Sequence, residues 1–238
     1  MSAPSAVFSE ATGPGPGPAR RELKYVMAAS YADAAQAWLD HHAAPDPRFE
    51  YNAIHSLYFD TRGLEAYDRK LASDFLKWKV RLRWYTDETG AQFSDQAFLE
   101  LKCKEGAVSR KTRAALDLDV ASLDRDPFAL ARSLCLPSRL ALPARGVLAP
   151  VAVISYRRRR YIEMSSGSRL ALDQRIEARA EAGGPFRHGA CRLDSAVLEV
   201  KGPRAGELPP ALYRLQELTG ARKQSFSKYG ECVRTLLG

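Results

Sequence analysis

The residues with the clearest capacity for chemistry are Arg, Lys and Glu side chains that recur at every second position of segments with alternating polarity. Side chains two residues apart project from the same face of a β-strand, so this spacing gathers charges on one face. Residues 75–85 show the pattern best, because Lys79, Arg81 and Arg83 alternate there with large apolar residues. The same spacing relates further charged residues: Glu22 and Lys24; Glu100, Lys102 and Lys104; Arg158 and Arg160; Arg169, Asp173 and Arg175; Glu199 and Lys201.

A charged face of this composition suits a polyanion and a metal ion. The guanidinium group of Arg offers forked donors that match phosphate oxygens, and the ammonium group of Lys acts as a point charge. The carboxylate oxygens of Glu22, Glu100 and Glu199 are of the kind that usually binds Mg²⁺ or Mn²⁺. Phosphate groups together with a divalent metal are therefore the simplest ligands for this pattern.

The elements that must position these charges are mainly strands. Alternating polarity predicts strands at residues 21–27, 51–60, 75–85, 96–105, 151–163, 169–177 and 193–201. Helical spacing and capping signals predict helices at residues 31–42 and 64–71, two helical pieces within 121–136, and a last helical region that Pro209 opens.

The backs of the charged strands indicate how the strands are packed. Trp78, Val80, Leu82 and Trp84 are large and apolar, and we expect helices to cover them. The charged face is then the interior of a closed barrel, in which no strand edge is exposed. A sheet with one face in water is the alternative. The predicted fold class is α+β, mainly β, as a closed antiparallel barrel with flanking helices.

Composition indicates a globular protein with an anionic partner. The chain has 238 residues, of which 45% are hydrophobic, enough for one sizeable core. Its net charge of +8 favours nucleic acid, a membrane surface or a phosphorylated small molecule. Nucleic acid is the weaker alternative, because residues 157–160, all Arg, divide between two faces of a strand and lack an aromatic stacking platform.

Other segments bear on domain organisation and location. Residues 1–18 end in alternating Gly and Pro and lack the features of a secretory signal, so we expect a disordered tail before one domain at residues 19–238. The four cysteines have no close partner in sequence, which is typical of reduced thiols in a cytoplasmic protein. No apolar run approaches the ~20 residues that span a bilayer.

Eight short motifs, in order along the chain, connect the charged strands to a known family. They are Glu22-Leu-Lys-Tyr25, Ser56-Leu-Tyr-Phe-Asp60, Lys79-Val-Arg-Leu-Arg83, Leu99-Glu-Leu-Lys102, Tyr156-x-Arg158-x-x-Tyr161, Arg169-x-x-x-Asp173, Leu198-Glu-Val-Lys201 and Ser227-Lys-Tyr229. With them the sequence resembles the VTC domain, the polyphosphate polymerase branch of the triphosphate tunnel metalloenzymes. Each motif alone is weak, and the ordered set is specific.

The resemblance implies an eight-stranded tunnel that holds ATP, triphosphate or polyphosphate with Mn²⁺ or Mg²⁺. The positions that match phosphate contacts are Lys24, Arg81, Arg83, Lys102, Arg158, Arg169, Lys201 and Lys228. Glu199 matches the metal ligand, with Glu22 and Glu100 as helpers. The implied catalytic set is Arg81, Arg83, Lys201 and Glu199. From the residues themselves, Asp173 is expected either to help hold the metal or, as the favoured alternative, to orient Arg169 and Arg175.

The resemblance leaves the reaction open. An ATP-dependent polyphosphate polymerase is the first expectation, with a triphosphatase or polyphosphatase and a non-catalytic phosphate-binding module as alternatives. Ser225 stands where the family often has a second Lys, and Lys223 is the candidate substitute. Eukaryotic members carry membrane helices and a phosphate-sensing domain that this chain lacks, so a membrane-protein partner is left open.

Overall fold

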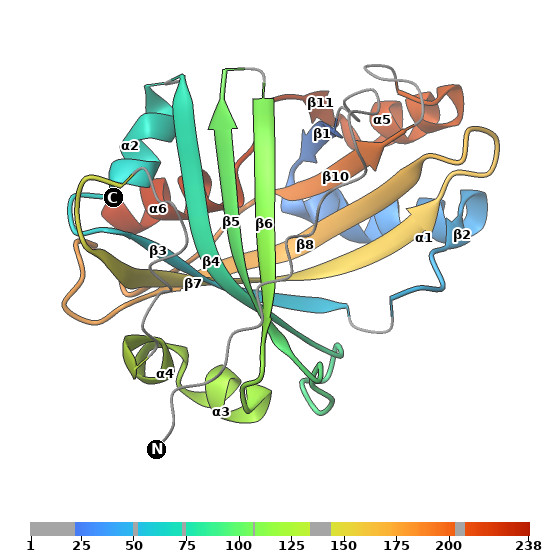
Figure 1. Ribbon diagram of the computed structural model, residues 1–238. Coiled ribbons are helices and arrows are strands. Elements are labelled where there is room, and N and C mark those ends of the chain that lie inside the picture. Colours follow the sequence, from blue (N-terminus) through green and yellow to red (C-terminus); the bar gives the residue numbers. More distant parts are fainter. Residues whose placement is uncertain (1–21, 50–51, 73–74, 107, 134–143, 203–207) are drawn as a thin grey trace.

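The computed structural model of the chain describes residues 22–49, 52–72, 75–106, 108–133, 144–202 and 208–238. The predicted tail at residues 1–18 lies outside these ranges. The described strands form one antiparallel sheet with flanking helices (Figure 1).

Its strands and helices alternate irregularly along the chain. The strands are β1 (Glu22–Met27), β2 (Ala44–Pro45), β3 (Ala53–Thr61), β4 (Leu76–Thr86), β5 (Ala97–Glu105), β6 (Val108–Leu116), β7 (Leu148–Ile162), β8 (Arg169–Ala180), β9 (Ala190–Arg192), β10 (Ala196–Lys201) and β11 (Arg222–Lys223). The helices are α1 (Ala32–His42), α2 (Glu65–Leu71), α3 (Val120–Arg125), α4 (Pro127–Ser133), α5 (Tyr213–Thr219) and α6 (Lys228–Leu237).

The sheet is not closed, so the predicted closed barrel is wrong. Its strand order is β11-β1-β10-β8-β7-β3-β4-β5-β6, which leaves β11 and β6 as the edges of the described sheet. Among the described residues, β11 pairs with β1 at Tyr25 and Val26, and β6 pairs with β5 alone. The sheet is nevertheless strongly twisted, with β4, β5 and β6 upright while β7 and β8 run across them (Figure 1).

Helices cover the apolar backs of the strands, as the sequence predicts. Trp78, Leu82 and Trp84 of β4 are almost fully buried in a cluster with residues of α3 and α4. A second cluster joins α1 and α5 to the backs of β1, β8 and β10, with Leu39 and Leu172 fully buried. Burial of these apolar faces directs the charged side chains to the opposite, inner face of the sheet.

Helix α6 packs against part of that inner face. Tyr229 stacks on Tyr58 of β3 with ring centroids 4.7 Å apart, and its hydroxyl donates to Asp60 at 2.5 Å. Val233 and Leu236 belong to the same buried cluster as Tyr156 of β7. The helix therefore fills part of the inner face and places its first residues beside the charged positions of the sheet.

The short strands β2, β9 and β11 and the longer β6 were absent from the elements predicted from sequence. Strand β6 was not predicted, although Gly106 and the alternating Lys111 and Arg113 that follow it are consistent with a hairpin. The two helical pieces predicted within residues 121–136 are confirmed as α3 and α4, which are separated at Asp126. The last three residues of that range lie outside the described part of the chain.

The described helices are all too short or too polar to cross a bilayer.

Candidate functional site

A cavity of about 370 Å³ lies on the inner face of the sheet. Basic residues that line it are Lys24, Lys79, Arg81, Arg83, Lys102, Lys111, Arg158, Lys201 and Lys228. Acidic residues that line it are Glu22, Glu100 and Glu199. Strands β1, β3, β4, β5, β6, β7 and β10 and helix α6 all contribute to the lining. The surplus of positive charge makes this cavity suited to an anion of high charge.

One side of the cavity, here called the basic wall, consists of Lys79, Arg81, Arg83, Lys102 and Lys111 on β4, β5 and β6, with Glu100 among them. Glu100 accepts hydrogen bonds from Arg81 Nε at 2.7 Å and lies 2.8 Å from Lys111 Nζ. Burial raises the pKa of Glu100, but Arg81, Arg83 and Lys111 outweigh it and hold the pKa at about 2. A single ionised carboxylate therefore serves several cations.

Hydroxyl groups position the arginines of the basic wall. Arg83 Nε donates to Ser56 Oγ at 3.1 Å, and Arg81 Nη1 donates to Tyr58 Oη at 3.1 Å. These bonds hold both guanidinium groups against a neighbouring strand, and no flexible loop is involved. The orientation of their remaining N–H donors is therefore fixed. Such fixed donors suit the phosphate groups of a bound chain.

The opposite side, here called the mixed wall, consists of Lys24, Arg158, Lys201 and Lys228 together with Glu22, Glu199 and Asp173. Asp173 is fully buried and accepts two hydrogen bonds from Arg158, at 2.5 and 2.6 Å, and one from Lys228. Arg158 Nη2 also donates to Glu199 Oε2 at 2.8 Å. The cations of this wall are therefore paired with carboxylates of the protein itself.

Glu22 and Glu199 lie on the paired strands β1 and β10. Burial and the nearby Glu199 raise the pKa of Glu22, but Lys201 and Lys24 outweigh them and hold it below its ordinary value. Burial likewise raises the pKa of Glu199, and Arg158, Lys228 and Lys24 lower it well below the ordinary range. Both carboxylates are ionised at neutral pH.

This pair of carboxylates fits a divalent metal. In the described part of the chain, no three His, Cys, Asp or Glu side chains are grouped closely enough to hold a metal ion together. Mg²⁺ in phosphate-binding sites commonly uses one or two carboxylates, several waters and oxygens of the substrate. Glu22 and Glu199 meet that requirement, and the contribution of Glu100 to metal binding stays a prediction.

The cavity brings together most of the residues that the sequence singled out. Of the eight predicted phosphate contacts, Arg169 alone does not line it; its Nη2 lies 3.5 Å from Asp46 Oδ2 and its side chain is 40% exposed. The favoured orienting role of Asp173 is also wrong, since its partners are Arg158 and Lys228. Arg175 is exposed, because a left-handed backbone conformation interrupts the alternation of β8 there.

Further residues line the cavity that the sequence did not assign to it. Lys79 begins the motif Lys79-Val-Arg-Leu-Arg83 and lies on the same face as Arg81, so the period-two spacing was a signal that could have assigned it to the cavity. Lys111 was missed because β6 was missed. Ser227 caps α6 by accepting from the Gly230 N–H at 3.1 Å, and it also accepts from Lys79 Nζ at 2.7 Å. Tyr58 and Tyr156 contribute hydroxyl groups.

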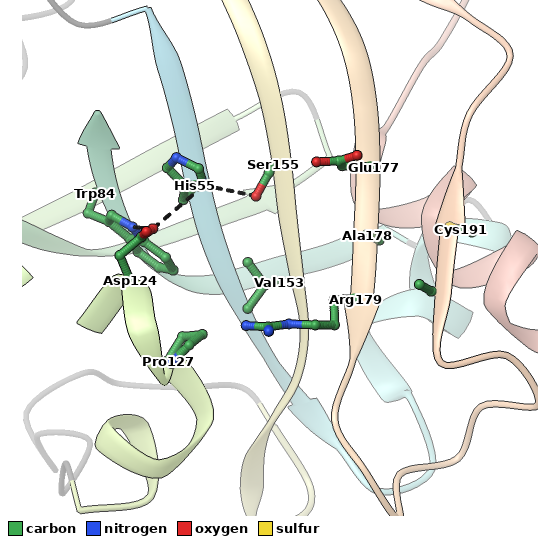
Figure 2. Close-up of a pocket in the computed structure, with 11 residues that line it drawn as sticks. His55, Trp84, Asp124, Pro127, Val153, Ser155, Glu177, Ala178, Arg179 and Cys191 are labelled. Atoms are coloured by element: carbon green, nitrogen blue, oxygen red, sulfur yellow. Dashed lines mark hydrogen bonds and ion pairs between the residues drawn. The ribbon is translucent and has the colours of Figure 1, made fainter. Parts of the chain in front are cut away.

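A second pocket, of about 350 Å³, lies outside this cavity (Figure 2). At its centre the His55 Nδ1 is 2.9 Å from Ser155 Oγ, and the other ring nitrogen is 3.1 Å from Thr86 Oγ1. Asp124 accepts from the Trp84 indole at 2.7 Å. Among the described residues, Arg179 is the one Lys or Arg that lines this pocket, so the pocket lacks the basic character of the inner cavity.

The fold and the site define a protein with a cation-lined cavity on a curved antiparallel sheet. The family profile of the VTC domain matches residues 19–237, and the chain belongs to this family. Family membership confirms the resemblance seen in the motifs and supports a role in phosphoryl transfer or polyphosphate chemistry.

Structural comparison agrees with this fold. A solved structure from Bacillus halodurans, described as a proposed adenylate cyclase, aligns with a TM-score of 0.52 over 87% of this chain and 93% of that chain. The two sequences are 14% identical, so the likeness concerns the fold alone. Comparison with curated proteins gives no significant match.

Proposed function

We propose that this protein is a metal-dependent phosphoryl transferase that moves the terminal phosphoryl group of ATP to the end of a polyphosphate chain and releases ADP. The observation that carries the proposal is the cavity itself, in which nine basic side chains face three carboxylates. An extended chain of phosphates supplies negative charge along its whole length. The VTC family membership supports polyphosphate as the form of that chain.

The residues of the two walls have different roles in this reaction. Arg81, Arg83 and Lys102 of the basic wall, with Lys24, Arg158, Lys201 and Lys228 of the mixed wall, bind phosphate oxygens and hold donor and acceptor in line. Arg81, Arg83 and Lys201 also neutralise charge as the phosphoryl group moves. Phosphoryl transfer depends mainly on positioning and charge neutralisation, so no covalent nucleophile is required.

Glu199 and Glu22 are the residues that would hold Mn²⁺ or Mg²⁺. The bound metal supplies a Lewis acid that withdraws charge from phosphate oxygens. Lys24 lies 3.4 Å from Glu22 and 3.9 Å from Glu199, and Lys201 lies 3.0 Å from Glu22. These lysines keep both carboxylates ionised and place cationic groups beside them.

The acceptor decides between the related reactions. In the proposed transfer, the bond between the β,γ-bridging oxygen and the γ-phosphorus breaks, and a terminal oxygen of polyphosphate forms the new bond. The products are then ADP and a chain that is one phosphate longer. With water as acceptor the products are ADP and orthophosphate.

The experiment is to incubate the protein with ATP and Mn²⁺ or Mg²⁺ and to measure ADP, orthophosphate and polyphosphate separately. ADP together with growing polymer supports the proposal. Orthophosphate without polymer would assign a hydrolase, and tight triphosphate binding without turnover would assign a binding module. Pyrophosphate with cyclic AMP would indicate the activity that the description of the Bacillus halodurans protein names.

Matched variants connect the activity to the cavity. Glu199→Gln and Glu22→Gln should each remove the metal-dependent turnover. Of the two, Glu22→Gln should disturb the fold less, because the side chain of Glu22 is 33% exposed. Glu177→Gln is the control, since Glu177 lies on the exposed side of β8 and outside the cavity. Equal loss of activity in all three would contradict the assignment of the metal-binding residues.

A further inference from the structure

The cations of the cavity are not equally compensated. In the basic wall Arg81, Arg83 and Lys111 lie within 4.0 Å of Glu100. Every basic residue of the mixed wall has Glu22, Glu199 or Asp173 within the same distance. Lys79 and Lys102 are the exceptions, because neither forms an ion pair with a carboxylate of the described residues.

Lys79 is the more extreme of the two. It stands opposite Lys102 in the register of β4 and β5, and Lys102 stands opposite Lys111 in the register of β5 and β6. Like charges placed directly opposite one another on neighbouring strands repel. This row of lysines therefore concentrates positive charge at one level of the cavity.

Cationic groups approach Lys79 from several elements. Lys24 faces it from β1, Arg81 from its own strand, Lys102 from β5 and Lys70 from α2. On the side of α6 it meets the Ser227 hydroxyl, which accepts its hydrogen bond at 2.7 Å. A hydroxyl group accepts this bond from a neutral amine as well as from an ammonium group, so it does not supply the missing negative charge.

We propose that the cavity takes up a proton from solvent when it binds a phosphate chain, and that Lys79 is the side chain that receives it. In the free protein the amine of Lys79 is mostly neutral above pH 7. A bound phosphate supplies the counter-charge that the protein lacks at this position, so the amine and one proton form the ammonium group. The inference rests on the proposed function, because it requires phosphate in this cavity.

The electrostatics of the free site agree with this arrangement. Burial lowers the pKa of Lys79 most, the cations Lys24, Arg81 and Lys102 lower it further, and the result is a pKa of about 7. A phosphate beside the amine reverses the second effect and raises the pKa toward its ordinary value of 10.5. Between these two pH values binding takes up a proton, and affinity falls as pH rises, by up to about tenfold per pH unit.

The test is calorimetric titration of tripolyphosphate into the wild type, Lys79→Arg and Lys102→Arg. The titrations are done at pH 7.5 without divalent cations, in buffers with different ionisation heats. The dependence of the binding heat on the buffer gives the number of protons taken up. Proton exchange by tripolyphosphate itself is common to all three proteins, so differences between them report on the lysines.

The wild type and Lys102→Arg are expected to take up about half a proton or more beyond Lys79→Arg, because Arg stays charged throughout. Equal uptake by the wild type and Lys79→Arg would overturn the inference while leaving the proposed function intact. Loss of uptake in Lys102→Arg alone would move the role to Lys102. Absence of binding in all three would refute phosphate binding and, with it, the inference.

A second variant, Lys79→Met, tests whether the pH dependence of binding comes from the amine of Lys79. Lys79→Met also has no titrating amine, and it fits a partly buried position without a charge. Its binding should be weaker than that of the wild type and should lack the additional pH dependence above pH 7. If Lys79→Met keeps the wild-type pH dependence, the proton goes elsewhere.

Discussion

The basic wall has five cations and the single carboxylate of Glu100, whereas the mixed wall has four cations that face Glu22, Glu199 and Asp173. The mixed wall therefore balances most of its charge within the protein. The basic wall keeps an excess of positive charge that has no partner until an anion binds. The comparison indicates that the ion pairs of the mixed wall stabilise the fold. The excess positive charge of the basic wall lowers the stability of the fold and raises its affinity for an anion.

The strongest test of this comparison is removal of the central acid of the mixed wall. Asp173→Ala leaves Arg158 and Lys228 buried beside fewer negative charges. We expect the free energy of unfolding to fall by about 3–5 kcal/mol, which is typical when one partner of a buried ion pair is deleted. Urea denaturation measures the change.

The surface pair of Glu88 and Arg159, 2.7 Å apart, is the control for that variant. Glu88→Ala should cost less than about 1 kcal/mol because water screens the pair. If Asp173→Ala costs no more than Glu88→Ala, the ion pairs of the mixed wall do not support the fold.

Acid sensitivity tests the one carboxylate of the basic wall. The pKa of Glu100 is about 2 in the folded protein and 4.5 is its ordinary value, so its contribution is complete above pH 4.5 and declines as pH falls toward 2. The corresponding stability is about 3 kcal/mol. Unfolding measured from pH 6 to pH 2 should show a smaller pH dependence in Glu100→Gln.

Glu105→Gln provides the comparison on the same strand, because Glu105 is exposed and does not line the cavity. Its pH dependence should match that of the wild type. A wild-type pH dependence in Glu100→Gln would show that Glu100 does not hold the basic wall together.

Affinity tests the other half of the comparison. Lys102 lines the cavity without a carboxylate partner, so Lys102→Met should weaken tripolyphosphate binding about tenfold, or about 1.4 kcal/mol, without lowering stability. Lys104→Met is the control, since Lys104 is two residues further along the same strand and does not line the cavity. Equal effects of both variants on binding would mean that the cavity boundary is misplaced.

The smallest effect is expected for Arg169. Because Arg169 is directed toward Asp46 and lies outside the cavity, Arg169→Ala should change tripolyphosphate affinity less than about twofold. Calorimetric titration beside Lys102→Met gives the comparison. A loss of affinity as large as that of Lys102→Met would show that Arg169 contacts phosphate, as its motif implies.

Much of the inner face could be predicted from the sequence, because a strand obeys a strict period of two. Lys79, Arg81 and Arg83 share a face whatever the tertiary structure is, and the apolar Trp78 and Leu82 identify the covered back. The ordered motifs then related separate strands to one cavity. The face of the sheet on which each of these residues lies was therefore predictable from the local alternation of polar and apolar residues.

Features that depend on neighbouring elements were not predictable in this way. Closure of the sheet depends on a contact between its first and last strands, and β11 and β6 are the unpaired edges of the described sheet. Arg175 left the inner face because a left-handed residue breaks the period of β8. The partners of Asp173 could not be predicted either, since Lys228 comes from a helix 55 residues further along the chain. Each error arose where tertiary contacts overrode the alternating pattern.

The position of α6 in the chain has a consequence for biosynthesis. Ser227, Lys228 and Tyr229 follow every strand of the sheet in sequence, yet they bond to Lys79, Asp173 and Asp60 on strands synthesised much earlier. On the ribosome, the strands emerge first and their buried Asp173 lacks one of its two cationic partners until α6 is released. The part of the cavity lining that Ser227 and Lys228 supply is therefore completed only after the strands of the sheet have been synthesised.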